Sequence, residues 1–310
     1  MTRSSSPSGV HLPRSGNRPT SERFRTLDRY RAEREWRRYE GNALRDLFRE
    51  LRRRFLVRNF VARGWVIDAG CGPGRFTAFD RSEGVRWAAF DVSSEMLRTA
   101  RRFGRGHGGS GEVDWIRADA RFPPFRTDAA STVIALGNLI GFLEGSGRSA
   151  LVELARLVEP HGRLLLEIAP GPGTYSVYLH RLPDGVLARR LRGSADYVVE
   201  RAVREGFVPA PFRRSRPSSF VRYSLDELRA IVEPLGFELL EALSVAPALG
   251  RSAERLERLR NDDAVWNRLV SVEEVLGREP GTWPNAAAVL AAFERHPNAD
   301  RPVEGTIKGG

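Results

Sequence analysis

The sequence predicts an α/β protein built on a doubly wound, largely parallel sheet. Short apolar runs typical of buried parallel strands recur along residues 64–169. Segments with helical patterning separate several of these runs, and the first run ends in the glycine-rich turn Gly70–Gly74. Strands that alternate with helices pack as parallel neighbours joined by right-handed crossovers. At 310 residues, the chain is long enough for one large domain with an appendage.

The N-terminal region is strongly basic and is expected to contain a tail and a helical segment. Residues 1–64 carry 17 arginines and 7 acidic residues, which accounts for most of the net charge of +11. Residues 1–25 lack the apolar core of a secretory signal and are rich in Ser, Arg, Pro and Gly, so we expect a disordered tail; an organelle transit peptide has a similar composition. Residues 26–63 are expected to be helical, because apolar side chains recur at steps of three and four. These side chains are Trp36, Tyr39, Ala43, Leu47, Leu51 and Phe55. The stripe favours a packed helix over a nucleic-acid-binding arm.

Five strands are expected in the first half of the chain, with helices between several of them. The expected strands are residues 64–70, 85–91, 113–119, 131–137 and 163–169, and the expected helices are residues 75–81, 94–103 and 149–158. Ser93 or Ser94 is a suitable N-cap for the second helix. The segment Pro160-His161-Gly162 is a turn signal before the fifth strand, and we expect His161 to be structural.

The second half of the chain interrupts this alternation and then resumes it. Residues 171–220 are expected to form a cap inserted over the carboxyl ends of the strands, with one strand at 197–203. A helix at 225–235, a strand at 237–244, a helical insertion at about 251–277 and a last strand near 288–293 follow. Within the insertion, helices are expected at 253–259 and 264–276. The α/β domain would thus span residues 64–297, and residues 298–310 would be a flexible C-terminus.

The glycine turn after the first strand points to a ligand site without a pyrophosphate. Glycine lets the backbone approach a ligand closely, and a turn between a strand and a helix lies where open α/β sheets bind ligands. The dinucleotide fingerprint G-x-G-x-x-G would require a third glycine where Arg75 or Thr77 stands. A phosphate-binding P-loop would require Gly-Lys-Ser/Thr, and no lysine is present here.

Three acidic residues occur at or near the ends of successive strands. Asp68 precedes the glycine turn, Asp91 ends the second strand and Asp119 ends the third. A carboxylate at Asp91 can accept hydrogen bonds from ribose hydroxyls, and one at Asp119 can accept a hydrogen bond from an adenine amino group, with Ala120 or Phe122 beside the ring. Acids gathered at one sheet edge repel one another unless a cation lies among them, so the ligand is expected to be cationic.

The segments VIDAGCGPGRFT, AFDVSSEML and IRADARFPPF resemble the class I S-adenosylmethionine-dependent methyltransferase superfamily, over roughly residues 60–170. The resemblance implies a Rossmann-like seven-stranded sheet that ends in an antiparallel hairpin, although the helical insertion departs from the simplest pattern. It also implies S-adenosyl-L-methionine as cofactor, with the glycine turn beside its methionine part, Asp68 near its amino group, Asp91 on the ribose and Asp119 on adenine. Met96 either packs near adenine or belongs to the core. The expected cofactor-binding residues are Asp68, Gly70, Cys71, Gly72, Gly74, Asp91, Val92, Met96, Asp119, Ala120 and Leu136.

The catalytic residues are not identified by the sequence. Methyl transfer depends mainly on alignment and exclusion of water, so a protein base is not required for a good nucleophile. Glu167, Tyr175 and His180 are weak candidates, and Tyr178, Tyr30 and Tyr39 also belong near the expected mouth. Each has an alternative role in the surface or the core. The fourth strand ends in Gly137-Asn138 without the Pro-Pro-aromatic motif of enzymes that methylate nucleobase or glutamine amines, which argues against those acceptors.

These observations predict a methyltransferase that acts on a small molecule, since a cap makes a closed pocket. An RNA or protein methyltransferase and a non-catalytic adenosylmethionine-binding module are the alternatives. Nucleic acid is a less favoured partner. The single cysteine, Cys71, excludes an internal disulfide and a multi-cysteine zinc site, so we expect no metal and a reducing, cytoplasmic environment. No apolar run is long enough to span a membrane.

Overall fold

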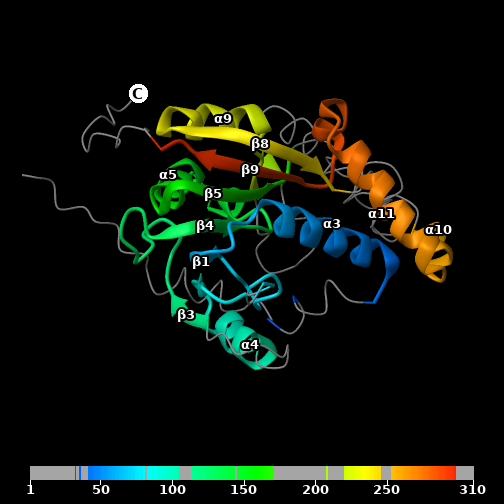
Figure 1. Cartoon of the computed structure of the whole chain (residues 1–310), viewed down its shortest axis with the longest axis horizontal. Helices are drawn as coiled ribbons and strands as arrows, with labels where there is room; N and C mark the ends of the chain where they lie inside the picture. The colour runs from blue at the N-terminus through cyan, green and yellow to red at the C-terminus, as the bar shows by residue number, and fades with distance from the viewer. Residues whose placement is uncertain are drawn as a thin grey trace, which may run out of the picture.

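The computed structural model describes residues 32, 35, 41–77, 79–80, 82–104, 113–143, 145–170, 207–208, 220–245 and 253–297. Seven strands form one sheet in the order β3-β2-β1-β4-β5-β9-β8 (Figure 1). Their bounds are β1 (Gly64–Ala69), β2 (Val85–Asp91), β3 (Val113–Arg117), β4 (Ala130–Ala135), β5 (Val158–Ile168), β8 (Phe237–Ser244) and β9 (Val289–Arg295). The first five strands pair in parallel, and β9 is antiparallel to both β5 and β8. The doubly wound sheet with a final antiparallel hairpin is therefore confirmed.

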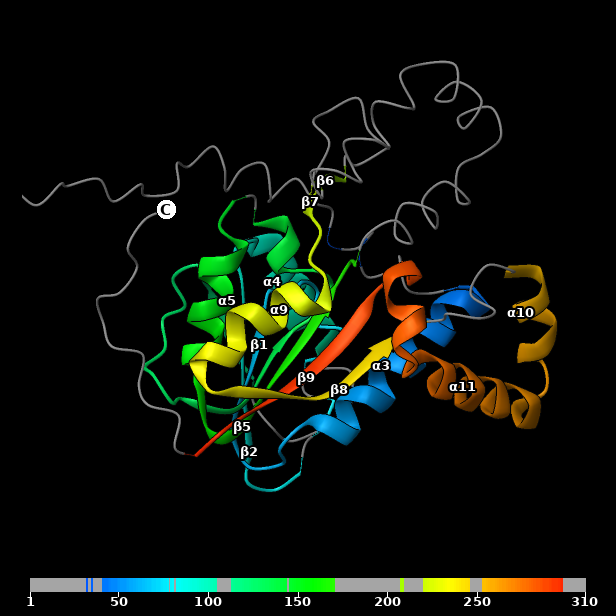
Figure 2. The ribbon, with the colours of Figure 1, turned by 90° about the horizontal axis from the view of Figure 1, so that it is seen from above.

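Helices cover both faces of this sheet (Figure 2). One face carries α3 (Ala43–Asn59), α10 (Ala253–Arg260) and α11 (Asp263–Gly277), whereas α5 (Gly147–Arg156) and α9 (Leu225–Val232) lie on the other. The remaining long helix, α4 (Ser94–Gly104), packs beside β2 and β3. Because both faces are covered, the central strands are mostly apolar, and every residue of β4 is buried, including Ser131 and Thr132. The helical insertion thus lies against one face of the sheet and does not disturb its last two strands.

Helix α3 packs through the apolar stripe that its sequence predicts. Asn42 caps the helix, since its Oδ1 accepts a hydrogen bond from the Arg45 backbone at 3.0 Å. Leu47, Leu51 and Phe55 are fully buried in the layer between α3 and the sheet. The residues at 32 and 35 are also helical, while Trp36 and Tyr39 lie outside the described residues, as does Tyr30. The prediction of a packed helix is confirmed for residues 43–59.

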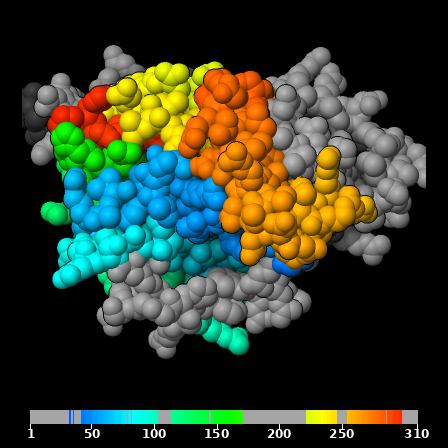
Figure 3. All heavy atoms as spheres, turned by 45° about the vertical axis from the view of Figure 1, so that its right-hand side comes forward, coloured from blue at the N-terminus to red at the C-terminus, as the bar shows by residue number. Residues whose placement is uncertain are grey.

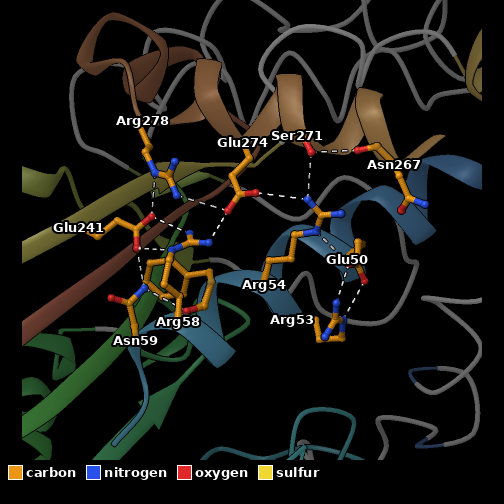
Figure 4. A network of polar contacts seen from close by, with 11 residues as sticks. Glu50, Arg53, Arg54, Arg58, Asn59, Glu241, Asn267, Ser271, Glu274 and Arg278 are labelled. Carbon is orange, nitrogen blue, oxygen red and sulfur yellow. Dashed lines mark hydrogen bonds and ion pairs between the residues drawn. The ribbon is translucent and has the colours of Figure 1, made fainter. Parts of the chain in front are cut away.

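Ion pairs and hydrogen bonds connect α3 to β8 and α11 in the C-terminal part of the chain (Figure 4). Glu241 on β8 accepts hydrogen bonds from Arg58 at 2.7 and 3.2 Å, from Asn59 at 2.6 Å and from Arg278 at 3.1 Å. Burial opposes its ionisation, but these donors lower the pKa of Glu241. Glu274 on α11 also pairs with Arg58. The surfaces of α3 and α11 accordingly adjoin in Figure 3.

The segment after the glycine turn differs from the prediction. A helix was expected over residues 75–81, but among the described residues of this stretch the chain forms turns and bends and no helix. Pro73 and Gly74 precede it and Gly84 follows closely, so too few residues remain for a helix to offset its nucleation cost. The Thr77 hydroxyl instead bonds to Asp68, and the Asp80 carbonyl accepts a hydrogen bond from the indole of a β2 tryptophan.

The other element boundaries agree with the predictions to within a few residues, except at β5. This strand begins at Val158 and includes the expected turn, where His161 has a left-handed backbone (φ 62°) and the register to β4 shifts. The described chain also contains three short 3-10 helices, which are η2 (Ile140–Phe142), η3 (Glu233–Leu235) and η4 (Pro280–Asn285).

Most of the expected cap, residues 171–220, lies outside the described residues, together with its expected strand at 197–203. The described part contributes the strands β6 (Phe207–Val208) and β7 (Phe220–Val221), which pair antiparallel. Tyr175, Tyr178 and His180 also lie outside the described residues. Among the helices of the described chain, none has the length and apolar character needed to cross a bilayer.

Candidate active site

The glycine turn at the carboxyl end of β1 has a left-handed backbone at three alternate positions. The φ angles of Gly70, Gly72 and Gly74 are 63°, 54° and 79°. A Cβ on Gly74 would lie 2.9 Å from Ala100, so packing requires this glycine, whereas a Cβ on Gly70 would lie 2.6 Å from the end of the Leu139 side chain, which would have to move. Among the described residues, and apart from its two chain neighbours, a Cβ on Gly72 would meet no atom within 4 Å. The middle glycine therefore faces open space, where a ligand can approach the backbone.

Asp91, the last residue of β2, holds this turn in place. Its Oδ2 accepts a hydrogen bond from the Gly72 backbone at 2.9 Å, and its Oδ1 accepts one from the Ser93 backbone at 2.8 Å. The Cys71 backbone donates to the Phe90 carbonyl at 3.0 Å. Turn and carboxylate form one unit at the strand ends, as expected for a site that aligns a ribose beside the glycine turn.

Asp68 is the buried acid of the site, with 4% of its surface exposed. Burial, together with the negative charge of Asp91, raises its pKa to about 7, although the Thr77 hydroxyl, which donates to Oδ2 at 2.5 Å, opposes the shift. Burial and the same two carboxylates also raise the pKa of the Cys71 thiol. A carboxyl that gives up its proton near neutral pH is suited to bind a cation, whereas a protonated thiol is not a nucleophile.

Asp119 lies two residues beyond β3 and already has a cationic neighbour. Its carboxylate accepts hydrogen bonds from Arg121 Nε at 2.9 and 3.0 Å, and Arg121 Nη2 also bonds to it. Ala120 beside it is buried, whereas Phe122 is 68% exposed. Sequence patterning did not indicate Arg121. A ligand amino group that reaches Asp119 must therefore share this carboxylate with a guanidinium.

The remaining predicted residues gather around the same strand ends. Val92 follows Asp91 directly, and its carbonyl accepts a hydrogen bond from Arg117 at 3.0 Å. Met96 is buried in the first turn of α4, where its backbone donates to Ser93 Oγ at 3.2 Å. Leu136 follows β4, which pairs with β1 through Asp68 and Ile134. The sheet register therefore brings together the predicted residues of β1, β2 and β4.

Glu167 occupies the end of β5 in a buried ion pair with α3. Arg52 Nε donates to Oε2 at 2.8 Å and Nη2 donates to Oε1 at 2.5 Å, and both side chains are almost fully buried. The Gly137 backbone also donates to Oε2 at 3.1 Å. A carboxylate held by a bidentate guanidinium is a poor proton acceptor, so these contacts favour a positioning role. The ion-pair role of Arg52 was not predicted. The signal that could have indicated it is the presence of an arginine between two buried apolar residues of the helix, Leu51 and Phe55.

No group of three or more His, Cys, Asp or Glu side chains within the described part of the chain is arranged to hold a metal ion. The residues at the strand ends do fit an adenosyl cofactor with a cationic amino acid part. Gly72 leaves open space at the turn, Asp68 supplies an ionisable buried carboxyl, and Asp91 supplies an oriented one.

Comparison with known proteins agrees with this geometry. Residues 66–162 match a methyltransferase domain family. The chain is 38% identical over 97 residues to a malonyl-[acyl-carrier protein] O-methyltransferase of Salmonella typhimurium, covering 31% of this chain and 36% of that protein. It is 33% identical over 135 residues to a trans-aconitate 2-methyltransferase of Azoarcus sp., covering 42% of this chain and 48% of that protein. The matches thus span less than half the length of either relative.

Solved structures share the fold. Magnesium protoporphyrin IX methyltransferase from Synechocystis PCC 6803, with bound S-adenosylhomocysteine, superposes with a TM-score of 0.53 at 16% identity, covering 87% of this chain and 97% of that one. A putative methyltransferase in complex with the Haloferax volcanii Trm112 activator gives a TM-score of 0.51 at 17% identity, covering 88% and 97%. Residues 66–162 therefore match a methyltransferase domain family, and the described chain has the fold of the class I S-adenosylmethionine-dependent methyltransferases.

Proposed function

We propose that this chain transfers a methyl group from S-adenosyl-L-methionine to a small molecule that carries a carboxylate. The observation that carries the proposal is the open glycine turn at Gly72, bonded to Asp91 and next to the buried Asp68. Residues 64–297 would form the catalytic domain, with 26–63 as a helical appendage.

The cofactor would lie along the carboxyl ends of β1, β2 and β3. Asp68 would accept a hydrogen bond from its amino group, Asp91 would hold the ribose, and Asp119 and Ala120 would border the adenine. Gly70, Cys71, Gly72 and Gly74 would line the methionine part, with Val92, Met96 and Leu136 packed around it. This arrangement places acidic side chains around a cationic nucleoside, which relieves their mutual repulsion.

The acceptor would approach from the side of β4 and β5. When bound, S-adenosylmethionine supplies an electrophilic methyl on a sulfonium sulfur. An acceptor oxygen would attack the methyl carbon while the carbon–sulfur bond breaks and its electron pair stays on sulfur. A carboxylate is already deprotonated near neutral pH and needs no protein base, which agrees with the engagement of Glu167 by Arg52. The acceptors named for the two relatives, a malonyl group and trans-aconitate, both carry carboxylates.

The test is calorimetric titration of the purified protein with S-adenosylmethionine and S-adenosylhomocysteine, followed by incubation with methyl-labelled cofactor and a pool of metabolites. We expect both nucleosides to bind and label to appear on a small acid. Absence of heat with both nucleosides would contradict the cofactor assignment. Binding without label on any acceptor would instead favour a non-catalytic module. Label on RNA or protein, supplied in a parallel incubation, would instead favour an RNA or protein methyltransferase.

Replacing Asp91 by alanine is expected to weaken S-adenosylhomocysteine binding by about 1.5–3 kcal/mol, the range for losing hydrogen bonds to a charged group. The loss combines the missing ribose contacts with the release of the Gly72 backbone. Calorimetry measures it. Asp114→Ala on β3, which also removes an acid but from outside the proposed site, is the control. An affinity of Asp91→Ala within twofold of the parent protein would contradict the ribose role.

Cofactor binding is expected to depend on pH through Asp68. The pKa of about 7 means that the carboxyl is largely protonated at pH 6 and largely ionised at pH 7.5. Since only the ionised form attracts the amino group, affinity for S-adenosylhomocysteine should rise about tenfold across this interval. Binding below pH 7 should also release a proton, which calorimetry in two buffers of different ionisation enthalpy detects. Asp68→Asn should bind more weakly with a flat profile, and a flat profile in the parent protein would refute the assignment.

A further inference from the structure

The turn after β4 holds two successive residues in the left-handed region. Gly137 has φ 69° and Asn138 has φ 61°. Glu167 accepts a hydrogen bond from the Gly137 backbone, and the Asn138 carbonyl accepts bonds from the backbones of Gly141 at 3.0 Å and Phe142 at 3.3 Å. Asparagine tolerates this conformation better than most residues. The turn is therefore fixed from both sides, and the direction of the Asn138 side chain is fixed with it.

The Asn138 carboxamide is oriented by one hydrogen bond and has one group without a partner. Its Oδ1 accepts from the Ala169 backbone at 3.2 Å, and because a backbone N–H can only donate, this bond assigns the oxygen and the nitrogen. Asn138 as a whole is only 8% exposed, and within the described structure the buried Nδ2 has no hydrogen-bond partner. Burying an unsatisfied donor is unfavourable, so this group calls for an acceptor that arrives from elsewhere.

Asn138 lies next to the proposed cofactor site. The side chain of the following residue, Leu139, packs on Gly70 of the glycine turn. The carboxamide itself lies over Gly141, where an added Cβ would be 2.4 Å from Nδ2 and 2.5 Å from the Val221 carbonyl oxygen. Any side chain at position 141 would collide with the carboxamide and with this carbonyl, so the position of Asn138 requires glycine there.

The charge near the Asn138 carboxamide suits an anion. Glu167 is the acid at the ends of β4 and β5, and its charge is compensated by the bidentate contact with Arg52. An incoming carboxylate would therefore meet a donor on Asn138 without meeting an uncompensated charge on Glu167. A hydrogen bond to an ionised acceptor is about twice as strong as one to a neutral acceptor.

We propose that Asn138 Nδ2 is the binding group for a carboxylate oxygen of the methyl acceptor, with Glu167 and Arg52 as positioning residues that hold its turn. The inference rests on the proposed function, since the acceptor must lie beside the cofactor. It deepens that function by assigning acceptor recognition to the turn after β4.

The test uses protein loaded with S-adenosylhomocysteine and a panel of acetate, malonate, trans-aconitate, benzoate and octanoate, each beside its primary amide. Calorimetry is expected to show that at least one acid binds at least tenfold more tightly than its amide. Asn138→Asp retains the acceptor for Ala169 and the tolerance of the left-handed backbone but removes the donor. It should weaken the bound acid at least tenfold while the dissociation constant for S-adenosylhomocysteine stays within twofold.

Two further variants separate recognition from folding and from added charge. Asn138→Gly keeps the left-handed backbone and is expected to show the same loss, so it serves if Asn138→Asp does not fold. Asn267→Asp adds the same charge at an exposed position of α11 and should bind acid as the parent protein does.

The proposal is overturned if the loaded parent protein binds none of the acids, or if the Asn138 variants bind them within twofold of the parent. It is also overturned if a crystal structure of the loaded protein shows Nδ2 bonded to the Val221 carbonyl or to an enclosed water. Failure of S-adenosylhomocysteine to bind the parent protein is a different result, because it overturns the proposed function as well.

Discussion

Gly72→Val is expected to abolish binding of S-adenosylmethionine while the protein remains folded. The valine side chain would project into the open space in front of the turn, where no atom of the described residues, the chain neighbours aside, lies within 4 Å of the Cβ position. We expect no detectable heat at concentrations that saturate the parent protein, and circular dichroism should confirm that the fold is retained. Tight binding by this variant would refute the location of the cofactor.

The matched control for this substitution is Gly64→Val. Gly64 also has a left-handed backbone (φ 62°) and open space at its Cβ position, but it begins β1 at the opposite end of the strand. Both variants therefore carry a similar backbone strain. Loss of binding in Gly72→Val and retention in Gly64→Val would assign the effect to the ligand and not to the strained backbone.

Glu167→Ala is expected to lower the free energy of unfolding by about 3–5 kcal/mol, the usual cost of leaving one member of a buried ion pair without its partner. The substitution would leave the Arg52 guanidinium without its main counter-charge and would release the Gly137 backbone. Urea denaturation measures the change. A loss below about 1 kcal/mol would show that solvent or another acid compensates Arg52.

Two further variants test whether the unpaired buried charge causes this loss of stability. Arg53→Ala removes a neighbouring ion pair of the same helix, in which the arginine side chain is 54% exposed, and it should cost about 0–1 kcal/mol. Replacing both members, Arg52→Met with Glu167→Leu, should recover most of the stability lost in Glu167→Ala, because the buried charge is then gone. Equal losses in the single and double variants would instead indicate that packing, not charge, dominates at this site.

The strands and the glycine turn could be predicted because their signals are local. A buried parallel strand needs an apolar run, so the run GWVIDA predicted β1, and the stripe through Leu47 and Phe55 predicted the buried face of α3. The final hairpin followed from the superfamily resemblance. Local patterning could not show that residues 75–77 and 79–80 remain irregular, because the Thr77 hydroxyl bonds to Asp68 on the preceding strand.

Partners distant in sequence could not be predicted. Arg52 and Glu167 are 115 residues apart, and only the packing of α3 on the sheet brings them together. The same limit applies to Asn138. Its proposed role rests on a buried side-chain nitrogen without a hydrogen-bond partner, and only coordinates can show that. Arg121 is a different case: it is two residues from Asp119, but nothing in the pattern shows that its side chain turns back onto that carboxylate.

The position of β9 constrains the order of events during synthesis on the ribosome. Of the described strands, β9 is the last to be made, yet it lies between β5 and β8 and joins them. Until residue 295 has left the exit tunnel, β8 lacks its partner among the described strands. The edge of β5 that later pairs with β9 is then unpaired and apolar. Such edges recruit other chains, so a nascent or prematurely terminated polypeptide ending before β9 would be prone to aggregate and would depend on chaperones.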